Sequence, residues 1–173
     1  MKILETDRLI LRHMEMEDLD DLFALYSDPE VTRYIPDAPR SLVEAREELL
    51  WHIHGHPQHS ELGLWAAVHK GTGRFIGRCG LLPWTLDGQE EVEVAYLIAP
   101  EFQGQGLATE AAQAILNYGF ETLSLPRLVC LIDAENLASI RVAEKIGMRF
   151  EKEGRDEIGP FQLYSRSRSG AVR

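Results

Sequence analysis

The feature that most constrains this chain is a glycine-containing turn that joins an apolar run to a helical pattern. Residues 90–99 predict a strand, and Pro100 ends it. Gly104 and Gly106 then allow the backbone to turn tightly before the helical pattern begins. The first N–H groups of a helix have no partners within it, and the helix dipole adds positive charge. The turn therefore predicts an anion site suited to a pyrophosphate.

The turn alone is a weak signal. There is no Lys or Arg between Pro100 and Ala114, so charge neutralisation must come from backbone amides or from elsewhere in the chain. A Walker A loop is excluded because no Gly-Lys-Ser/Thr is present, and a dinucleotide fingerprint would need a third glycine. A turn that merely reverses the chain remains an alternative.

Hydrophobic periodicity places the other elements around this turn. Strands are predicted at residues 6–13, 62–69, 74–82, 90–99, 128–132, 148–153 and 160–166, and helices at 15–26, 41–54, 106–122 and 136–146. This order predicts an α/β (α+β) fold with one mixed, mostly antiparallel sheet flanked by helices. The length of 173 residues suits one domain, residues 1–166, followed by a polar, disordered tail at 167–173.

The charge balance limits the partners. The chain has 28 acidic and 18 basic residues, a net charge of −10. An acidic body repels phosphate backbones and attracts cations, so we expect a basic amine or peptide rather than a nucleic acid. Acidity that serves solubility alone is the other reading.

The cysteines and the hydropathy profile indicate a cytoplasmic protein. Cys79 and Cys130 lie in apolar runs and read as buried, reduced thiols. The charged amino terminus does not resemble a signal peptide, and no run is long enough for a membrane span.

A group of histidines raises the question of a metal site. His52 and His56 have i, i+4 spacing, but Gly55 and Pro57 break the helix that would align them. No pattern of cysteines or carboxylates completes a ligand set, so we expect no metal.

Several short patterns, in order along residues 3–165, resemble one family. Gln103-x-x-Gly106-x-Ala108 is similar to the acetyl-CoA signature of the GNAT N-acetyltransferase superfamily. Other patterns resemble the subgroup that contains the ribosomal-protein alanine N-acetyltransferases. They are Thr6-x-Arg8-Leu9-x-Leu11-Arg12, Glu93-x-x-Tyr96, Ala108-Thr109-Glu110-Ala111, Asn136-x-x-Ser139 and Glu144-Lys145-x-Gly147.

The resemblance implies the GNAT acyl-CoA N-acyltransferase fold and acetyl-CoA as co-substrate. Ile98 would pair its backbone with the pantetheine arm, and Asn136 would bind a pantetheine amide. A backbone N–H near Leu97 and Ile98 would stabilise the oxyanion. The backbone amides of one run would cradle the pyrophosphate: Gln103, Gly104, Gln105, Gly106, Leu107, Ala108 and Thr109.

Acetyl transfer to an amine also needs groups that move protons. A protonated amine is not a nucleophile, so a base or a water path must deprotonate it. Glu93 is the first candidate, since burial would raise its pKa, and Glu91 on the same strand face is the second. Many superfamily members protonate the leaving thiolate with a tyrosine at the position of Ala143 here. Ser139, one turn after Asn136, is the candidate instead.

The acceptor is less constrained. The subgroup resemblance implies the α-amine of a protein amino terminus, for instance of a basic peptide. A small amine is the alternative: a polyamine, an amino acid or an antibiotic. We expect residues 28–60 and the strand linkers to form most of the acceptor pocket. A non-catalytic acyl-CoA-binding sensor is the rival from another class, and the oligomeric state stays open between monomer and homodimer.

Overall fold

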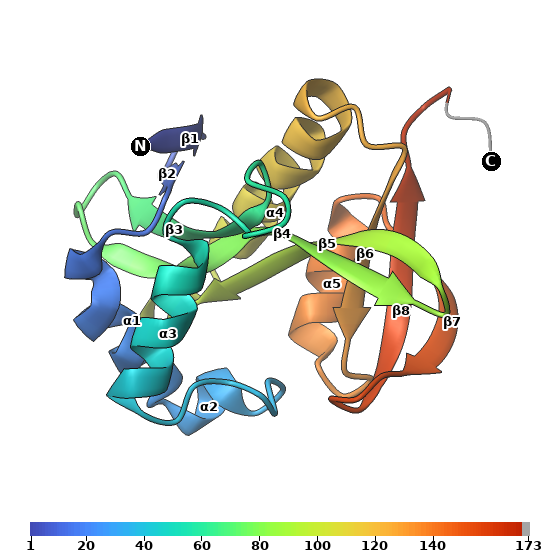
Figure 1. Ribbon diagram of the computed structural model, residues 1–173. Helices are drawn as coiled ribbons and strands as arrows, with labels where there is room; N and C mark the ends of the chain where they lie inside the picture. Colours follow the sequence, from blue (N-terminus) through green and yellow to red (C-terminus); the bar gives the residue numbers. More distant parts are fainter. Residues whose placement is uncertain (171–173) are drawn as a thin grey trace.

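Eight strands form one sheet in this computed structural model, which describes residues 1–170. Their spatial order is β1-β2-β3-β4-β5-β6-β8-β7 (Figure 1). Neighbouring strands are antiparallel except for β5 and β6, which are parallel. The strands are β1 Lys2–Glu5, β2 Leu9–Arg12, β3 Gly63–His69, β4 Phe75–Leu86, β5 Gln89–Ile98, β6 Arg127–Ile132, β7 Arg149–Arg155 and β8 Pro160–Ser167. The predicted mixed, mostly antiparallel sheet is confirmed.

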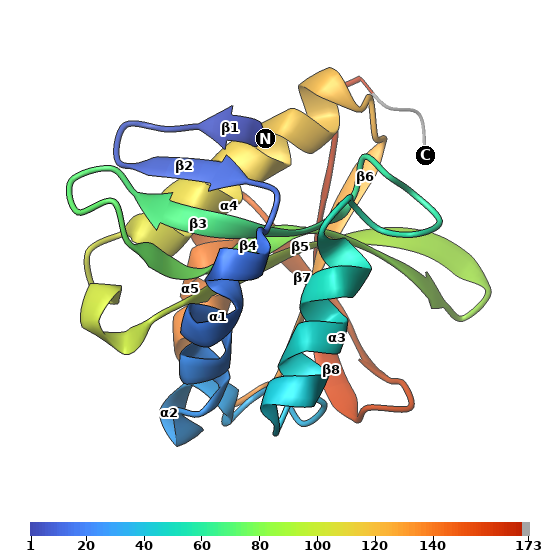
Figure 2. The same ribbon diagram turned by 60° about the vertical axis from the view of Figure 1, so that its left-hand side comes forward.

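Helices cover both faces of this sheet (Figure 2). They are α1 Leu19–Tyr26, α2 Pro29–Thr32, α3 Leu42–His52, α4 Leu107–Asn117 and α5 Leu137–Lys145. Successive strand residues point to opposite faces. Leu64 and Ala66 of β3 therefore pack under α1 and α3, whereas Trp65 and Ala67 belong to the core beneath α4 and α5.

Local sequence explains one tight turn between strands and the start of one helix. Asp87 and Gly88 both have positive φ, 50° and 75°, as the two-residue turn between β4 and β5 requires. Ser41 caps α3 by accepting a hydrogen bond from the Glu44 N–H, and Glu44 Oε2 accepts one from the Arg40 N–H.

The parallel neighbours β5 and β6 pair over a very short stretch. Their ladder contains the single pair Glu93 and Val129, and the pairing does not continue toward Ile98. The carboxyl-terminal half of β5 is thus bonded to β4 on one side only. This opening in the sheet positions the site described below.

Three predicted boundaries were wrong. The strand predicted at 6–13 is β2 alone, and its hairpin partner β1 lies before that range; β1 was missed because a short edge strand gives little alternation to detect. The helix predicted at 106–122 is α-helical only to Asn117, and a π-helical turn follows over Tyr118–Thr122. The tail does not begin at 167: Ser167 pairs with Arg127, and the Arg168 N–H donates to the Pro126 carbonyl. Residues 171–173 of the predicted tail lie outside the described residues.

None of the helices within residues 1–170 has the length and apolar character that crossing a membrane requires.

Candidate active site

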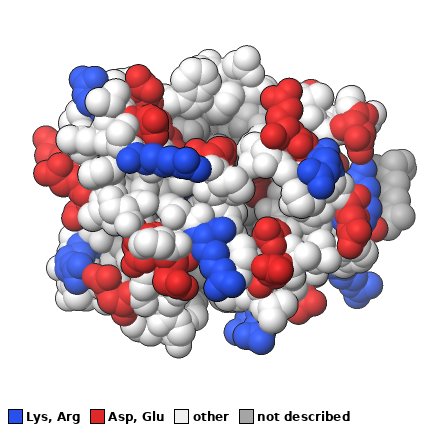
Figure 3. Space-filling model, turned by 90° about the horizontal axis from the view of Figure 1, so that it is seen from below, with Lys and Arg blue, Asp and Glu red and all other residues white. Residues whose placement is uncertain are grey.

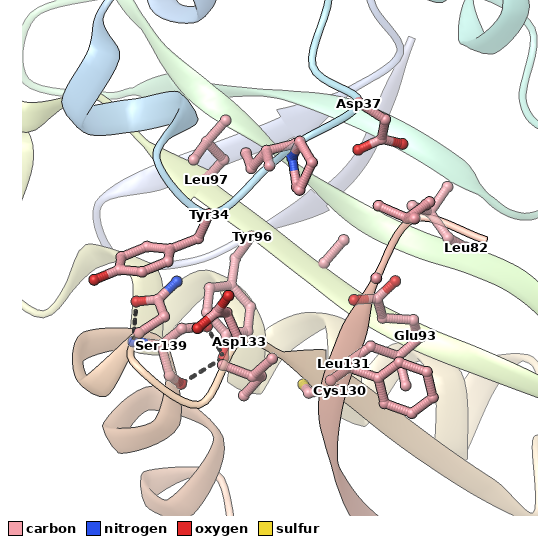
Figure 4. Close-up of a pocket in the computed structure, with 18 of the residues that line it drawn as sticks. Tyr34, Asp37, Leu82, Glu93, Tyr96, Leu97, Cys130, Leu131, Asp133 and Ser139 are labelled. Carbon is pink, nitrogen blue, oxygen red and sulfur yellow. Dashed lines mark hydrogen bonds between the residues drawn. The ribbon is translucent and has the colours of Figure 1, made fainter. Parts of the chain in front are cut away.

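A cavity of about 300 Å³ lies where β5 and β6 part. Its floor is made of residues 93–97 of β5 and 130–132 of β6. Residues 31–37, which include the end of α2, form one wall, and residues 156–161, before and in β8, form another. The Tyr34 hydroxyl donates to the Glu135 carbonyl over 3.2 Å and so links the first wall to the segment after β6. Figure 4 shows Glu93, Tyr96, Ser139 and Asp133 around the same space.

Four of the predicted site residues line this cavity together: Glu93, Leu97, Asn136 and Ser139. They come from β5, the β6–α5 connection and α5. The other predicted residues follow along the chain from Ile98, at the end of β5, through the turn to the start of α4, and are not among the lining residues.

Glu93 has the environment of a base that works near neutral pH. Burial raises its pKa to about 7, although a hydrogen bond from Trp84 and the nearby Arg78 charge oppose the rise. Trp84 Nε1 donates to Glu93 Oε2 over 2.7 Å and fixes the carboxylate, and the backbone N–H of Leu131 also lowers its pKa. A carboxylate with this pKa can both accept and release a proton at neutral pH.

Ser139 and Tyr96 form a hydrogen-bonded pair beside the cavity. Ser139 Oγ donates to the Tyr96 hydroxyl over 3.1 Å, and that hydroxyl donates to the Ser139 carbonyl over 2.8 Å. Burial holds the pKa of Tyr96 well above its usual value, so its hydroxyl remains protonated. The pair places two hydroxyl groups at the first turn of α5.

Asn136 caps the same helix. Its Oδ1 accepts a hydrogen bond from the Ser139 N–H over 3.2 Å, so the side-chain oxygen is engaged in the fold. The amide nitrogen Nδ2 remains as the donor that a bound molecule could use. One side chain therefore connects the helix start to the cavity.

The turn before α4 has the geometry of an open helix start. Gly104 and Gly106 have φ of 74° and 78°, which favours glycine, and a Cβ at Gly104 would meet nothing within 4 Å. Gly106 is the N-cap and provides no side-chain cap, so the first N–H groups of α4 have no such acceptor. Gln103 Nε2 donates to the Ile98 carbonyl over 2.8 Å and ties the turn to the end of β5.

Arg8 places a guanidinium against the turn, where Glu110 balances its charge. Its Nη1 donates to the Gln105 carbonyl over 2.8 Å, and its Nε pairs with Glu110 Oε2 over 2.7 Å. Glu110 Oε1 also accepts hydrogen bonds from the Thr6 hydroxyl and the Arg8 N–H. The sequence patterns contained Thr6, Arg8 and Glu110, but no spacing rule indicated that they meet.

Sequence reasoning also missed the acidic residues of the cavity. Asp37, Asp133 and Asp156 line it from three separate segments. Figure 3 shows one face of the molecule, on which acidic and basic side chains are interspersed. Nothing in the sequence distinguished these three aspartates from the other acidic residues.

Other expectations for the pocket need correction. Of residues 28–60, only residues within 31–37 line this cavity, because α3 packs on the sheet beside it. Among the aromatic residues, Trp84 and Tyr96 line the cavity, Trp65 is in the core and Trp51 is exposed. Glu91 is not a lining residue, and its carboxylate is bound by Arg127 Nε over 3.1 Å.

The histidines have structural contacts. His52 is buried, and its Nδ1 accepts a hydrogen bond from the Leu64 N–H over 3.2 Å. Burial lowers the pKa of His52 to about 4, so the ring is neutral at physiological pH. Within the part of the chain that the structure describes, no three His, Cys, Asp or Glu side chains are placed to hold a metal ion.

Comparison with known proteins gives a consistent result. Residues 8–149 match the model of the acetyltransferase (GNAT) domain. The uncharacterized protein YkkB of Bacillus subtilis (strain 168) is 40% identical over 94% of each chain. The uncharacterized N-acetyltransferase p20 of Bacillus licheniformis is 34% identical over 89% of this chain and 85% of its own. Spermidine N(1)-acetyltransferase of Escherichia coli (strain K12) is 31% identical over 83% of this chain and 74% of its own.

The fold comparison agrees with the sequence comparison. A GNAT-family acetyltransferase from Bacillus anthracis superposes with a TM-score of 0.78 and 26% identity, over 94% of this chain and 95% of the other. The family model covers most of the sequence, and the single mixed sheet flanked by helices is the fold that the resemblance implied. The chain therefore belongs to the GNAT family of N-acetyltransferases.

Proposed function

We propose that this enzyme transfers the acetyl group of acetyl-CoA to a primary amine bound in the cavity, with Glu93 as the base. The observation that carries this proposal is the position of Glu93: a carboxylate with a pKa of about 7, fixed by Trp84, at the point where β5 and β6 part. Acetyl-CoA supplies the thioester that the amine attacks. Glu93 accepts a proton from the ammonium form of the acceptor, and the free amine then forms the C–N bond as the C–S bond breaks.

The turn and the start of α4 would hold the pyrophosphate. The uncapped N–H groups that follow Gly106 offer partial positive charge, and the Arg8 guanidinium, which is paired with Glu110, lies beside the turn. Asn136 Nδ2 and the backbone of Leu97 and Ile98 would bind the pantetheine arm and the oxyanion. The thioester end of acetyl-CoA would thus lie at the cavity, and the pyrophosphate would lie at the turn before α4.

Ser139 would donate a hydrogen bond to the leaving thiolate, with Tyr96 as a positioning residue, and the thiolate would take its proton from the amine nitrogen once the C–N bond has formed. The hydroxyl of Ser139 lines the cavity and is held by Tyr96, whose own proton is engaged by the Ser139 carbonyl. Rotation of the Ser139 hydroxyl toward the thiolate breaks one hydrogen bond of about 1 kcal/mol and replaces it with a bond to an anion.

The acceptor class follows from the size and charge of the cavity. A space of about 300 Å³ admits a small amine or the first residues of a peptide, and the three aspartates favour a positively charged acceptor. The relative named for spermidine acetylation makes a small amine the first candidate. A protein N-terminal α-amine is the second, since a cavity of this size admits the first residues of a peptide.

The direct test is release of free thiol from acetyl-CoA in the presence of polyamines, amino acids, aminoglycosides and short basic peptides. We expect acceptor-dependent thiol release that Glu93→Gln reduces strongly, and Glu47→Gln, on the exposed surface of α3, should leave the rate unchanged. If the protein binds CoA but releases no thiol with every acceptor in the panel, the proposal is contradicted and a sensor is favoured.

A further inference from the structure

A buried arginine lies in the cavity wall; its charge lowers the pKa of Glu93, but its terminal nitrogens have no part in the proposed chemistry. Arg78 of β4 is 9% exposed and lines the cavity. In the β4–β5 ladder Arg78 is opposite Leu97, and Leu82 is opposite Glu93. Because side chains two or four residues apart in a strand point to the same face, Arg78 and Glu93 project from the same face of the sheet. Their spacing of four residues along the strands separates the two Cα positions by roughly 13 Å.

The fold holds the Arg78 guanidinium by one edge only. Nε donates to the hydroxyl of Tyr26 on α1, and this hydroxyl donates to Glu48 Oε1 on α3. The Glu48 carboxylate is 3.7 Å from Nε, so Glu48 offsets the charge but makes no direct hydrogen bond to the guanidinium. Two helices thus fix the direction of the side chain.

The other edge of the guanidinium is unused. Within residues 1–170, the hydrogen bonds of the Arg78 side chain involve Nε alone. Arg12, a partly buried arginine of the same sheet, provides the contrast: its Nη1 and Nη2 both donate to the Asp18 carboxylate, over 2.7 and 2.8 Å. An arginine in a fixed orientation, with two terminal nitrogens free at a cavity, matches the planar fork of a carboxylate.

We propose that Arg78 binds a carboxylate of the acceptor, which makes the acceptor of this enzyme a zwitterion: an amine with an acid group. The amine would lie at Glu93 and the carboxylate at Arg78, at opposite ends of the strand segment 93–97. This inference rests on the proposed acetyl transfer to an amine. It separates this enzyme from one that acts on a polyamine, because a second ammonium group near Arg78 would be repelled.

Acceptor binding to the CoA-loaded protein tests this proposal without requiring turnover. Calorimetry would compare three pairs whose members differ by one carboxylate: L-lysine and cadaverine, 4-aminobutyrate and propylamine, L-phenylalanine and phenethylamine. In at least one pair we expect the carboxylate member to bind the wild type at least about tenfold more tightly. Arg78→Gln should reduce that preference to about twofold or less. The matched control is Arg46→Gln, which removes an exposed positive charge of α3 and should retain the preference.

Two outcomes would overturn the carboxylate subsite. One is a wild type that binds no carboxylate member, or binds it no better than its partner, in every pair. The other is a preference that survives Arg78→Gln. Should Arg78→Gln fail to fold, Arg78→Lys keeps the charge but loses the fork, and should lower the preference severalfold.

Thiol release with the same six compounds separates this inference from the proposed function. Preferential, Arg78-dependent binding of a zwitterion without thiol release would leave the subsite standing and remove the acetyl transfer. Thiol release that does not depend on a carboxylate in the acceptor would leave the acetyl transfer standing and remove the carboxylate subsite.

Discussion

At the scale of single residues, the chemistry depends on how the protein holds one carboxylate. Burial of Glu93 raises its pKa to about 7, and the hydrogen bond from Trp84 together with the Arg78 charge keeps it from rising further. The balance matters because a base with a much higher pKa would be protonated at neutral pH, and one with a normal pKa would accept protons poorly. The surroundings of Glu93 therefore set the pH range in which it can act as a base.

The first prediction concerns the dependence of the rate on pH. The kcat/KM of the wild type should rise with pH up to about 7 and then level off, because Glu93 must lose its proton before it can act as a base. Glu93→Gln should lower kcat by about 10²- to 10⁴-fold and remove this limb. Stopped assays of thiol release from pH 5.5 to 9 measure both effects. CoA affinity by calorimetry is the control, and a wild-type profile in the Gln variant would remove Glu93 as the base.

The second prediction separates the two hydroxyl groups. Ser139→Ala removes the proposed donor to the thiolate, so kcat should fall about tenfold or more while acceptor KM changes little. Tyr96→Phe removes only the group that holds Ser139, so we expect a smaller loss of kcat. Steady-state rates with acetyl-CoA measure the difference. If Tyr96→Phe is the more damaging change, Tyr96 rather than Ser139 is the donor.

At the scale of elements, the amino-terminal ends of two helices would define the ends of the proposed cofactor site. The start of α4 is left without a side-chain cap, and it is held in place from outside by the contacts of Glu110 with Thr6 and Arg8. The start of α5, by contrast, is capped from within by Asn136. An open helix start is an anion site, whereas a capped one is a stable support for side chains.

The third prediction tests the double role of Asn136. Asn136→Asp keeps an oxygen that caps α5 but replaces the Nδ2 donor, so stability should change little and CoA affinity should fall about tenfold. Asn136→Ala removes both functions and should also lower the free energy of unfolding by about 1 kcal/mol. Denaturant unfolding and calorimetry with CoA read the two roles separately. Equal CoA affinity in all three proteins would show that the side chain only caps the helix.

At the scale of the whole molecule, periodicity and turn chemistry sufficed for the sheet and most of its elements. The strands predicted at 74–82 and 90–99 are β4 and β5, although β4 continues to Leu86, and the apolar run at 128–132 predicted the buried strand β6. The glycine turn predicted where α4 begins. These features are local, so they can be read from neighbouring residues.

The cavity could not be predicted in the same way because its lining comes from distant segments. Asp37 precedes Asp133 and Asp156 by about a hundred residues, and Arg78 reads in sequence as an ordinary polar position of a strand. Its burial follows from the packing of α1 and α3, which no periodicity of β4 reports. Only tertiary structure brings such residues together.

The last prediction concerns the stability of the whole protein. The folded pKa of Glu93 is about 7 against an ordinary value of 4.5, so the unfolded chain loses this proton at lower pH than the folded one. The stabilising contribution of the protonated form is complete below about pH 4.5 and is lost as pH rises through about 7. The free energy of unfolding of the wild type should therefore fall between pH 5 and 8, relative to Glu93→Gln, by on the order of 1–3 kcal/mol.

Urea unfolding at both pH values measures this difference, and Glu47→Gln, an exposed substitution of the same kind, is the control for a change of net charge. Parallel curves for wild type and Glu93→Gln would mean that Glu93 titrates normally in the folded protein. The base would then have to be sought in a water path. A larger fall in the wild type would show that the protein gives up stability at neutral pH to keep an ionisable carboxylate in its cavity, a cost expected of a functional group and not of a structural one.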